Sequence, residues 1–301
     1  MSESHTLNTN TFKAVTATLT GFFFLALVGL LVKLEIRAGA SIEWIVFMQY
    51  LVSLFIITLI ASRNKFLDLK TSKFRYHLIR GVFGVMAFTL FVTSVSEIPL
   101  VNANLLFNTT PIFIPVISMI WLKSKIDKKI WWGILLGFTG IIIILDPKAG
   151  GFLKIGDLTG LGAGFSLAVA YVAMSILTKT ESFITIIFYY SLTAFTLSVP
   201  LAVTNWSNPP LLIWIYAILT GMLFISYLYL LQYAYRYVPA VKLSPLNFSV
   251  IIFAGILDWV FYNHIPGIST FIGIILVSTG GIIAITLHHK IKPGIKHHWH
   301  F

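Results

Sequence analysis

Residues 131–145 read WWGILLGFTGIIIIL, and residues 271–285 read FIGIILVSTGGIIAI. When the chain is shifted by 140 residues, residues 81–145 align with residues 221–285 without a gap, and 14 of the 65 positions are identical. Identities of Ile, Leu, Val and Phe carry little information in so apolar a chain. Identities of Gly, Pro and Thr carry more, because backbone geometry or close packing demands such residues. They are Gly81/Gly221, Pro99/Pro239, Gly133/Gly273, Thr139/Thr279 and Gly140/Gly280. The chain therefore contains an internal repeat.

The composition indicates that this repeat lies in a membrane. Hydrophobic residues make up 57% of the 301 residues, charged residues make up only 10%, and the mean hydropathy is +0.90. A soluble domain carries about 25% charged residues. The alternative, a large soluble protein with buried core helices, does not account for many apolar runs of spanning length. Cysteine is absent, so disulfides, thiolate metal sites and cysteine nucleophiles are excluded.

Ten stretches of the chain have the roughly 20 apolar residues that a helix needs to cross a bilayer. They are residues 14–32, 44–62, 77–96, 100–121, 130–146, 158–178, 183–203, 211–235, 240–262 and 268–287. We therefore predict an all-α membrane protein with ten transmembrane helices.

A repeat of five spans forces an inverted arrangement. Five is an odd number, so the second copy enters the membrane from the opposite side, and a pseudo-two-fold axis in the membrane plane relates the copies. The predicted organisation is an N-terminal cytoplasmic tail (1–13), a first five-helix repeat (14–147), a second, inverted repeat (158–287) and a basic, His-rich cytoplasmic tail (288–301).

The distribution of Lys and Arg predicts the orientation. With the N-terminus inside, 17 of the 21 basic residues fall on inner segments and 4 on outer segments. Cytoplasmic loops carry this excess of positive charge, so both termini are expected in the cytoplasm and the chain in the cytoplasmic (inner) membrane. The net charge of +11 then faces lipid headgroups, and no basic run suggests a nucleic-acid partner.

Two junctions and the two glycine-rich repeat ends resemble a known family. The junctions are SEIPLVNANLLFNTTPIF (96–113) and RYVPAVKLSPLNFSV (236–250). The chain resembles a ten-span, EamA-type member of the drug/metabolite transporter superfamily, with EamA-like repeats over about residues 15–146 and 158–287. The resemblance implies transport, and a peripheral scaffold or contact role for the last helix of each repeat. Such repeats carry a Glu shortly before that helix, where this chain has Lys123 and Asn263.

The span at 100–121 carries the densest set of polar residues. Polar groups at membrane depth face the bundle interior or a wet cavity. Pro111 has no N–H, which frees the carbonyl of Phe107 and predicts a broken helix. We predict that this break lies beside the substrate, although Asn and Thr side chains also join neighbouring helices. The residues predicted here to bind substrate are Asn102, Asn108 and Thr109.

Other spans add candidates for a polar, aromatic-rich cavity. Aromatic rings suit flat or amphipathic metabolites, whereas the alternative is ordinary aromatic packing. The additional residues predicted to bind substrate are Tyr171, Tyr229, Gln232, Tyr233, Ser244 and Asn247. Prolines at the junctions and breaks are predicted hinges or gates, namely Pro99, Pro111, Pro239 and Pro245.

Carboxylates are expected to be absent from mid-depth. Glu97 and Asp258 both lie near the expected outer face. Asp258 is the candidate for ion coupling, with a polar cap in the outer leaflet as the alternative. A purely cationic cargo usually needs a carboxylate in the membrane. We therefore expect a small polar or amphipathic metabolite that is zwitterionic or neutral, such as an amino acid, a nucleoside-like compound or a vitamin-like compound.

The function predicted from these features is secondary transport by alternating access. The chain has no Walker-type loop for ATP, and we expect no cofactor and no metal site. The alternatives are a channel or facilitator and, less favoured, a membrane-embedded enzyme. Catalysis would need clustered His, Asp or Glu, whereas only His77 and His264 lie near spans, at opposite faces. Monomer and homodimer both remain open, as do the coupling ion and the direction of transport.

Overall fold

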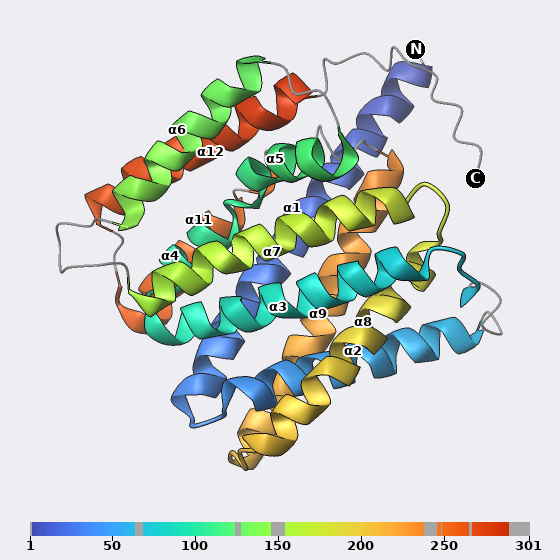
Figure 1. The fold of residues 1–301 in the computed structure, drawn as a ribbon, viewed down its shortest axis with the longest axis vertical. Helices are drawn as coiled ribbons and strands as arrows, with labels where there is room; N and C mark the ends of the chain where they lie inside the picture. The colour runs from blue at the N-terminus through green and yellow to red at the C-terminus, as the bar shows by residue number, and fades with distance from the viewer. Residues whose placement is uncertain are drawn as a thin grey trace.

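The computed structural model describes residues 2–63, 69–123, 128–145, 154–237, 246–247, 249–264 and 267–288. Within these ranges the chain forms helices and no strand (Figure 1). The helices are α1 (Ser2–Arg37), α2 (Ile42–Arg63), α3 (Phe74–Glu97), α4 (Leu100–Phe107), α5 (Thr110–Leu122), α6 (Lys128–Leu145), α7 (Ile155–Leu177), α8 (Phe183–Thr204), α9 (Leu211–Tyr237), α11 (Ser249–Tyr262) and α12 (Ile268–His288).

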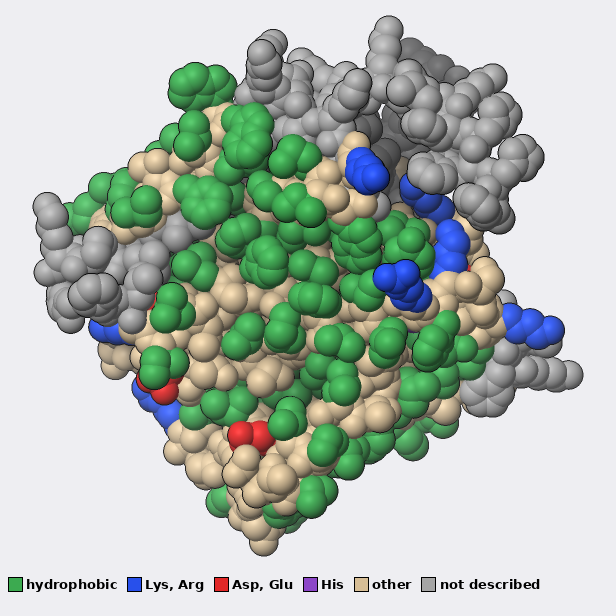
Figure 2. Space-filling view, viewed as in Figure 1, with side chains coloured by type: hydrophobic (Ala, Val, Ile, Leu, Met, Phe, Trp, Pro, Cys, Tyr) green, Lys and Arg blue, Asp and Glu red, His purple; other side chains and the backbone are tan. Residues whose placement is uncertain are grey.

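The helices carry the apolar surface that a bilayer requires. In lipid every backbone N–H and C=O must bond within the protein, which selects helices for spans. Seven of the described helical stretches are long and apolar enough to cross a membrane, counting α4 and α5 as one, and two shorter apolar helices cover Ser249–Tyr262 and Ile268–Gly280. Figure 2 shows apolar side chains spread over one face of the bundle, with most Lys and Arg near its edges.

The helix break predicted near Pro111 is confirmed. Helix α4 ends at Phe107 and α5 begins at Thr110, so Asn108 and Thr109 form the link between them. Pro111 cannot donate to the carbonyl of Phe107. The Thr110 hydroxyl donates to that carbonyl instead, at 2.7 Å. The broken span thus satisfies its own freed acceptor.

Helices that are distant in the chain pack together in pairs. The closest partners are α3 with α7, α1 with α9, α6 with α12, and α2 with α8. Secondary contacts join α3 to α8, α2 to α9, α1 to α11, α4 and α5 to α7, and α4 to α11. Helices α6 and α12 run side by side along one edge of the molecule (Figure 1).

Glycine brings α6 and α12 into backbone contact. A Cβ atom added at Gly280 would lie 2.5 Å from the Gly133 carbonyl oxygen and 2.5 Å from the Gly137 nitrogen. A Cβ atom added at Gly140 would lie 2.9 Å from the nitrogen of Val277. Small residues allow this approach between membrane helices. Packing of α6 on α12 therefore depends on these glycines.

Candidate functional site

A pair of tyrosines joins α2 to α8 in the interior of the bundle. The hydroxyl groups of Tyr50 and Tyr190 lie 2.9 Å apart and share a hydrogen bond. Their rings meet edge to face, with centroids 5.6 Å apart at 89°. Both side chains are buried. Tyrosine tolerates such burial because its ring packs while its hydroxyl finds a partner.

Further aromatic rings surround this pair. Phe88 of α3 lies 5.8 Å from the ring of Tyr50 and 6.1 Å from the ring of Phe224 on α9. Phe224 also lies 6.4 Å from Tyr190. Four helices, α2, α3, α8 and α9, therefore contribute to one aromatic cluster. Such a surface suits a flat or amphipathic ligand.

Arg80 of α3 lies against this cluster. Its side chain is 5% exposed, and its Cζ atom lies 4.2 Å from the centroid of the Tyr190 ring, a cation–π contact. A Cβ atom added at Gly84 would meet Nη1 of Arg80 at 2.7 Å, so the guanidinium group rests over Gly84. Among the described residues, Nε and Nη1 of Arg80 have no hydrogen-bond partner.

A buried ion pair lies at the meeting point of α1, α4 and α11. Lys33 donates to Asp258 at 3.0 Å, and Asp258 is fully buried. The second Asp258 oxygen lies 3.5 Å from the backbone N–H of Val101, in the first turn of α4, where the helix dipole favours a negative charge. Lys33 and Arg37 also lie over the Tyr262 ring, at 4.5 Å and 4.0 Å. Asp258 is thus held by a cation and a helix terminus.

The structure extends the first predicted span, 14–32, to Arg37, and this extension carries a buried carboxylate. Helix α1 continues past residue 32 to Arg37, and Glu35 on it is fully buried. Thr220, inside the apolar stretch Leu211–Leu231 of α9, donates its hydroxyl to Glu35 at 2.8 Å. The other Glu35 oxygen has no partner among the described residues. Lys33, Glu35 and Arg37 at the end of α1 each contact another helix of the bundle.

The predicted site residues of the broken span bond mainly within their own span. Asn108 donates to the Asn104 carbonyl at 2.8 Å, and Thr109 donates to the Leu106 carbonyl at 2.6 Å. The Thr109 hydroxyl is buried against Gly164 of α7, and a Cβ atom added at Gly164 would lie 2.6 Å from it. Asn102 reaches another helix, since it accepts a bond of 3.4 Å from Thr270 of α12. Their role in binding substrate stays a prediction.

The remaining predicted residues are spread over several helices. Tyr171 of α7 lies near enough to Tyr190 to interact with it electrostatically. Tyr229 is 59% exposed, and Tyr233 packs on Tyr237 with centroids 5.1 Å apart. Asn247 is half-buried. Ser244, Pro239, Pro245 and the side chain of Gln232 lie outside the described residues, while Pro99 and Pro111 flank α4 and open α5. Among the predicted residues that the structure describes, Tyr171 alone is placed near the Tyr50–Tyr190 pair.

Arg80 and Glu35 were not predicted as site residues. Arg80 lies inside the predicted span 77–96, and an ionisable residue within a span is itself a functional signal. Glu35 lies outside the predicted span 14–32, and its hydrogen-bond partner Thr220 is 185 residues away in the chain.

Comparison with known proteins assigns the family. The model of the EamA-like transporter family matches residues 12–146 and 154–286. The chain belongs to the EamA-like transporter family. It is therefore a multi-pass membrane protein and a transporter, as its apolar helices and its relatives both indicate.

Relatives of this EamA-like transporter carry small metabolites. The chain is 25% identical to an S-adenosylmethionine uptake transporter of Rickettsia bellii, over 69% of this chain and 72% of the relative. It is 24% identical to the pseudopaline exporter CntI of Pseudomonas aeruginosa, over 72% and 75%. It is 25% identical to a riboflavin transporter of Vibrio cholerae, over 66% and 67%. A solved crystal structure shares the fold, with a TM-score of 0.63 and 18% identity over 92% of this chain and 99% of the other.

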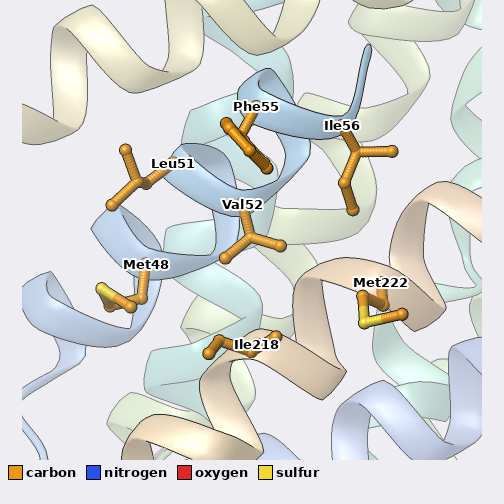
Figure 3. Close-up of a pocket in the computed structure, with 7 residues that line it drawn as sticks. All are labelled: Met48, Leu51, Val52, Phe55, Ile56, Ile218 and Met222. Atoms are coloured by element: carbon orange, nitrogen blue, oxygen red, sulfur yellow. The ribbon is translucent and has the colours of Figure 1, made fainter. Parts of the chain in front are cut away.

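A groove of about 520 Å³ lies between α2 and α9 of the EamA-like transporter (Figure 3). Its lining is entirely apolar and includes Phe55 and Met222, which are 63% and 49% exposed. The other lining residues are Met48, Leu51, Val52, Ile56 and Ile218. A metabolite site needs a few convergent polar groups, so the polar and aromatic interior is the better candidate.

Proposed function

We propose that the chain is a secondary transporter that moves a small polar or amphipathic metabolite by alternating access between two inverted halves. The first half comprises α1 to α6, and the second comprises α7 to α12. The cargo binds between the halves, beside the Tyr50–Tyr190 pair. The hydrogen bond between these tyrosines, one from each half, is the observation that carries the proposal.

The pattern of helix contacts supports a two-fold relation between the halves. Under the repeat, α3 corresponds to α9 and α7 corresponds to α1, so the contact of α3 with α7 becomes that of α9 with α1. The contact of α3 with α8 becomes that of α9 with α2 in the same way. The pairs α2 with α8 and α6 with α12 map onto themselves. Such a pattern is expected of two like units around a two-fold axis.

Contacts between individual residues show the same two-fold relation. Tyr50 and Tyr190 are 140 positions apart, which is the shift that aligns the repeats. On α6 and α12 the close approach of Gly140 to Val277 is matched by that of Gly280 to Gly137. Adding 140 to Gly140 gives Gly280, and adding 140 to Gly137 gives Val277. Both contacts would lie near the axis.

The positive charges support an orientation with both termini in the cytoplasm, and the inner membrane as the location. In Figure 1, α1 begins and α12 ends on the same side of the molecule, which agrees with an even number of crossings. The ion pair between Lys33 and Asp258 joins α1 of the first half to α11 of the second. In this orientation it helps to close the outer side, and it separates when that side opens.

The cargo is a metabolite with a flat or amphipathic surface. The aromatic cluster supports this, and relatives are named for S-adenosylmethionine, pseudopaline and riboflavin. No catalytic reaction is included in the proposal. A channel would need a continuous pore instead of two halves that meet across a central hydrogen bond.

The test is transport by the purified full-length chain in liposomes. Vesicles are loaded with one unlabelled metabolite at a time, and uptake of the same labelled metabolite is measured with and without a pH gradient. In a carrier, unlabelled cargo inside the vesicle accelerates uptake of labelled cargo. The reason is that the binding site returns to the outside faster when it is loaded than when it is empty. Tyr190→Phe and Phe88→Ala are expected to impair uptake, because both side chains belong to the interior beside which the cargo binds. Ion conductance without such acceleration would favour a channel and contradict the proposal.

A further inference from the structure

The guanidinium group of Arg80 lies deeper in the bundle than is usual for an arginine near the end of a helix. It lies in the second turn of α3, close to where the helix begins at Phe74. A long basic side chain near the end of a span normally extends outward to the headgroups. Here the guanidinium group instead lies over Gly84, one turn further into the helix. The missing Cβ at Gly84 makes that position accessible.

Among the described residues, the polar groups beside the Arg80 guanidinium are the hydroxyls of Tyr50 and Tyr190, and no carboxylate pairs with it. No Asp or Glu in the described part of the chain forms a salt bridge with it, and Nε and Nη1 lack partners there. Its charge acts electrostatically on the hydroxyls of both Tyr50 and Tyr190. An uncompensated buried charge is costly unless an anion completes it. The arrangement thus lacks one component, an acceptor with negative charge.

The tyrosine pair can supply a further donor. Two hydroxyl groups carry two protons, and only one proton is used in the bond between them. The second proton has one weak acceptor at hand, the Gly84 carbonyl at 3.4 Å from Tyr50. An anion beside Arg80 could accept this proton and the free N–H groups together. Charge-assisted bonds of this kind are the strong ones.

We propose that Arg80 is the anion-binding residue of the cargo site, and that the cargo carries a carboxylate which lies beside Arg80, Tyr50 and Tyr190. This inference rests on the proposed function, because it places the charged end of the cargo within the same interior. The aromatic cluster of Phe88 and Phe224 then receives the apolar part. The cargo class is an amphipathic carboxylate, including zwitterions.

The experiment measures binding and therefore does not depend on transport. The purified full-length chain in detergent is heated with L-phenylalanine, benzoate or inorganic phosphate, and with the uncharged or cationic counterparts benzamide and L-phenylalaninamide. The variants are Arg80→Gln and Arg80→Lys. Arg75→Gln is the matched control, because Arg75 is an exposed arginine on the same helix.

The carboxylates are expected to raise the melting temperature of the wild type and of Arg75→Gln, and their amides are expected to have no effect. Arg80→Gln should lose the shift, and Arg80→Lys should keep part of it. Without ligand, Arg80→Gln should melt at or above the wild-type temperature, because a buried unpaired charge has been removed. A shift with phosphate alone would overturn the carboxylate assignment.

Three further results of the melting experiment would overturn the inference. They are equal shifts in Arg80→Gln and wild type, equal shifts with amides and carboxylates, and no shift of the wild type with any carboxylate. A liposome assay separates this failure from failure of the proposed function. If the wild type and Arg80→Gln exchange the same metabolite at the same rate, the transporter proposal stands and the role of Arg80 is wrong.

Discussion

The hydroxyl groups of Tyr50 and Tyr190 lie 2.9 Å apart, although 140 residues separate them in the chain. The same shift aligns residues 81–145 with residues 221–285. The separation of the two tyrosines in the chain equals that shift, as the proposed two-fold relation between the halves requires. The interior around this pair also contains the buried cation Arg80 and the cluster of rings from four helices.

The first prediction concerns this hydrogen bond. Tyr50→Phe and Tyr190→Phe should each lower the free energy of unfolding by about 1 kcal/mol, because each removes the same buried bond. The double variant should lose little more than either single variant. Unfolding of the two single variants and the double variant in mixed detergent micelles measures this coupling, and Tyr229→Phe, at an exposed position, is the control. Additive losses would mean that the two hydroxyls have separate partners.

The ion pair of Lys33 and Asp258 leads to a second prediction. Asp258→Leu or Lys33→Met should each cost about 3–5 kcal/mol of stability, because each leaves the partner's charge inside the protein without its ion-pair partner. The double variant Lys33→Met/Asp258→Leu should recover most of the loss. Thermal unfolding checks this, and a double variant as unstable as the sum of the singles would contradict it.

A third prediction concerns the contact of α6 with α12. Gly280→Ala should lower stability by about 1–3 kcal/mol, because the added methyl group meets backbone atoms that cannot rotate away. Gly255→Ala is the control, since its added methyl group finds only a Val101 side-chain atom at 3.5 Å. If Gly280→Ala and Gly255→Ala unfold at the same temperature, α6 and α12 do not approach as closely as described.

The break between α4 and α5 gives a fourth prediction. Thr110→Val removes the hydroxyl that donates to the Phe107 carbonyl and should cost about 1–2 kcal/mol. Thr110→Ser keeps the hydroxyl and should stay near the wild type. Thr196→Val, at an exposed hydroxyl that bonds within its own helix, controls for the general effect of the substitution. Unfolding measurements on the three variants decide whether the Thr110 hydroxyl takes the place of the N–H that Pro111 lacks.

The apolar runs and the repeated Gly and Pro residues predict the helical class, the break before Pro111 and the close packing at Gly140 and Gly280. These features depend on single residues, because a missing N–H frees one carbonyl and a missing Cβ allows one close approach between helices. The buried charges are different. Hydropathy places Glu35 beyond the first span, whereas in the structure Glu35 is buried and accepts a hydrogen bond from Thr220 of α9. Asp258 is fully buried and pairs with Lys33, 225 residues away. Such partners are set by tertiary packing.

For the residues predicted to bind substrate, too, the sequence does not reveal the tertiary contacts. Asn108 and Thr109 are polar residues on a span, but their bonds to the Asn104 and Leu106 carbonyls follow from the helix break itself. Arg80 is visible in the sequence as a charge within a span. Only the contact with Tyr190 and the space over Gly84 distinguish it from an arginine that extends to the headgroups.

The most direct test of two inverted halves is the membrane side of matched positions. The chain has no cysteine, so a single introduced cysteine is the only thiol that a membrane-impermeant maleimide can label in this protein. The first matched pair is Ala38→Cys and Thr178→Cys, and the second is Ser72→Cys and Leu212→Cys. All four positions are exposed, and each pair is 140 residues apart.

In intact cells, Ala38→Cys and Leu212→Cys should be labelled from outside. Thr178→Cys and Ser72→Cys should react only after the membrane is permeabilised. Labelling of both members of either pair from the same side would contradict the inverted arrangement, and with it the alternating-access account.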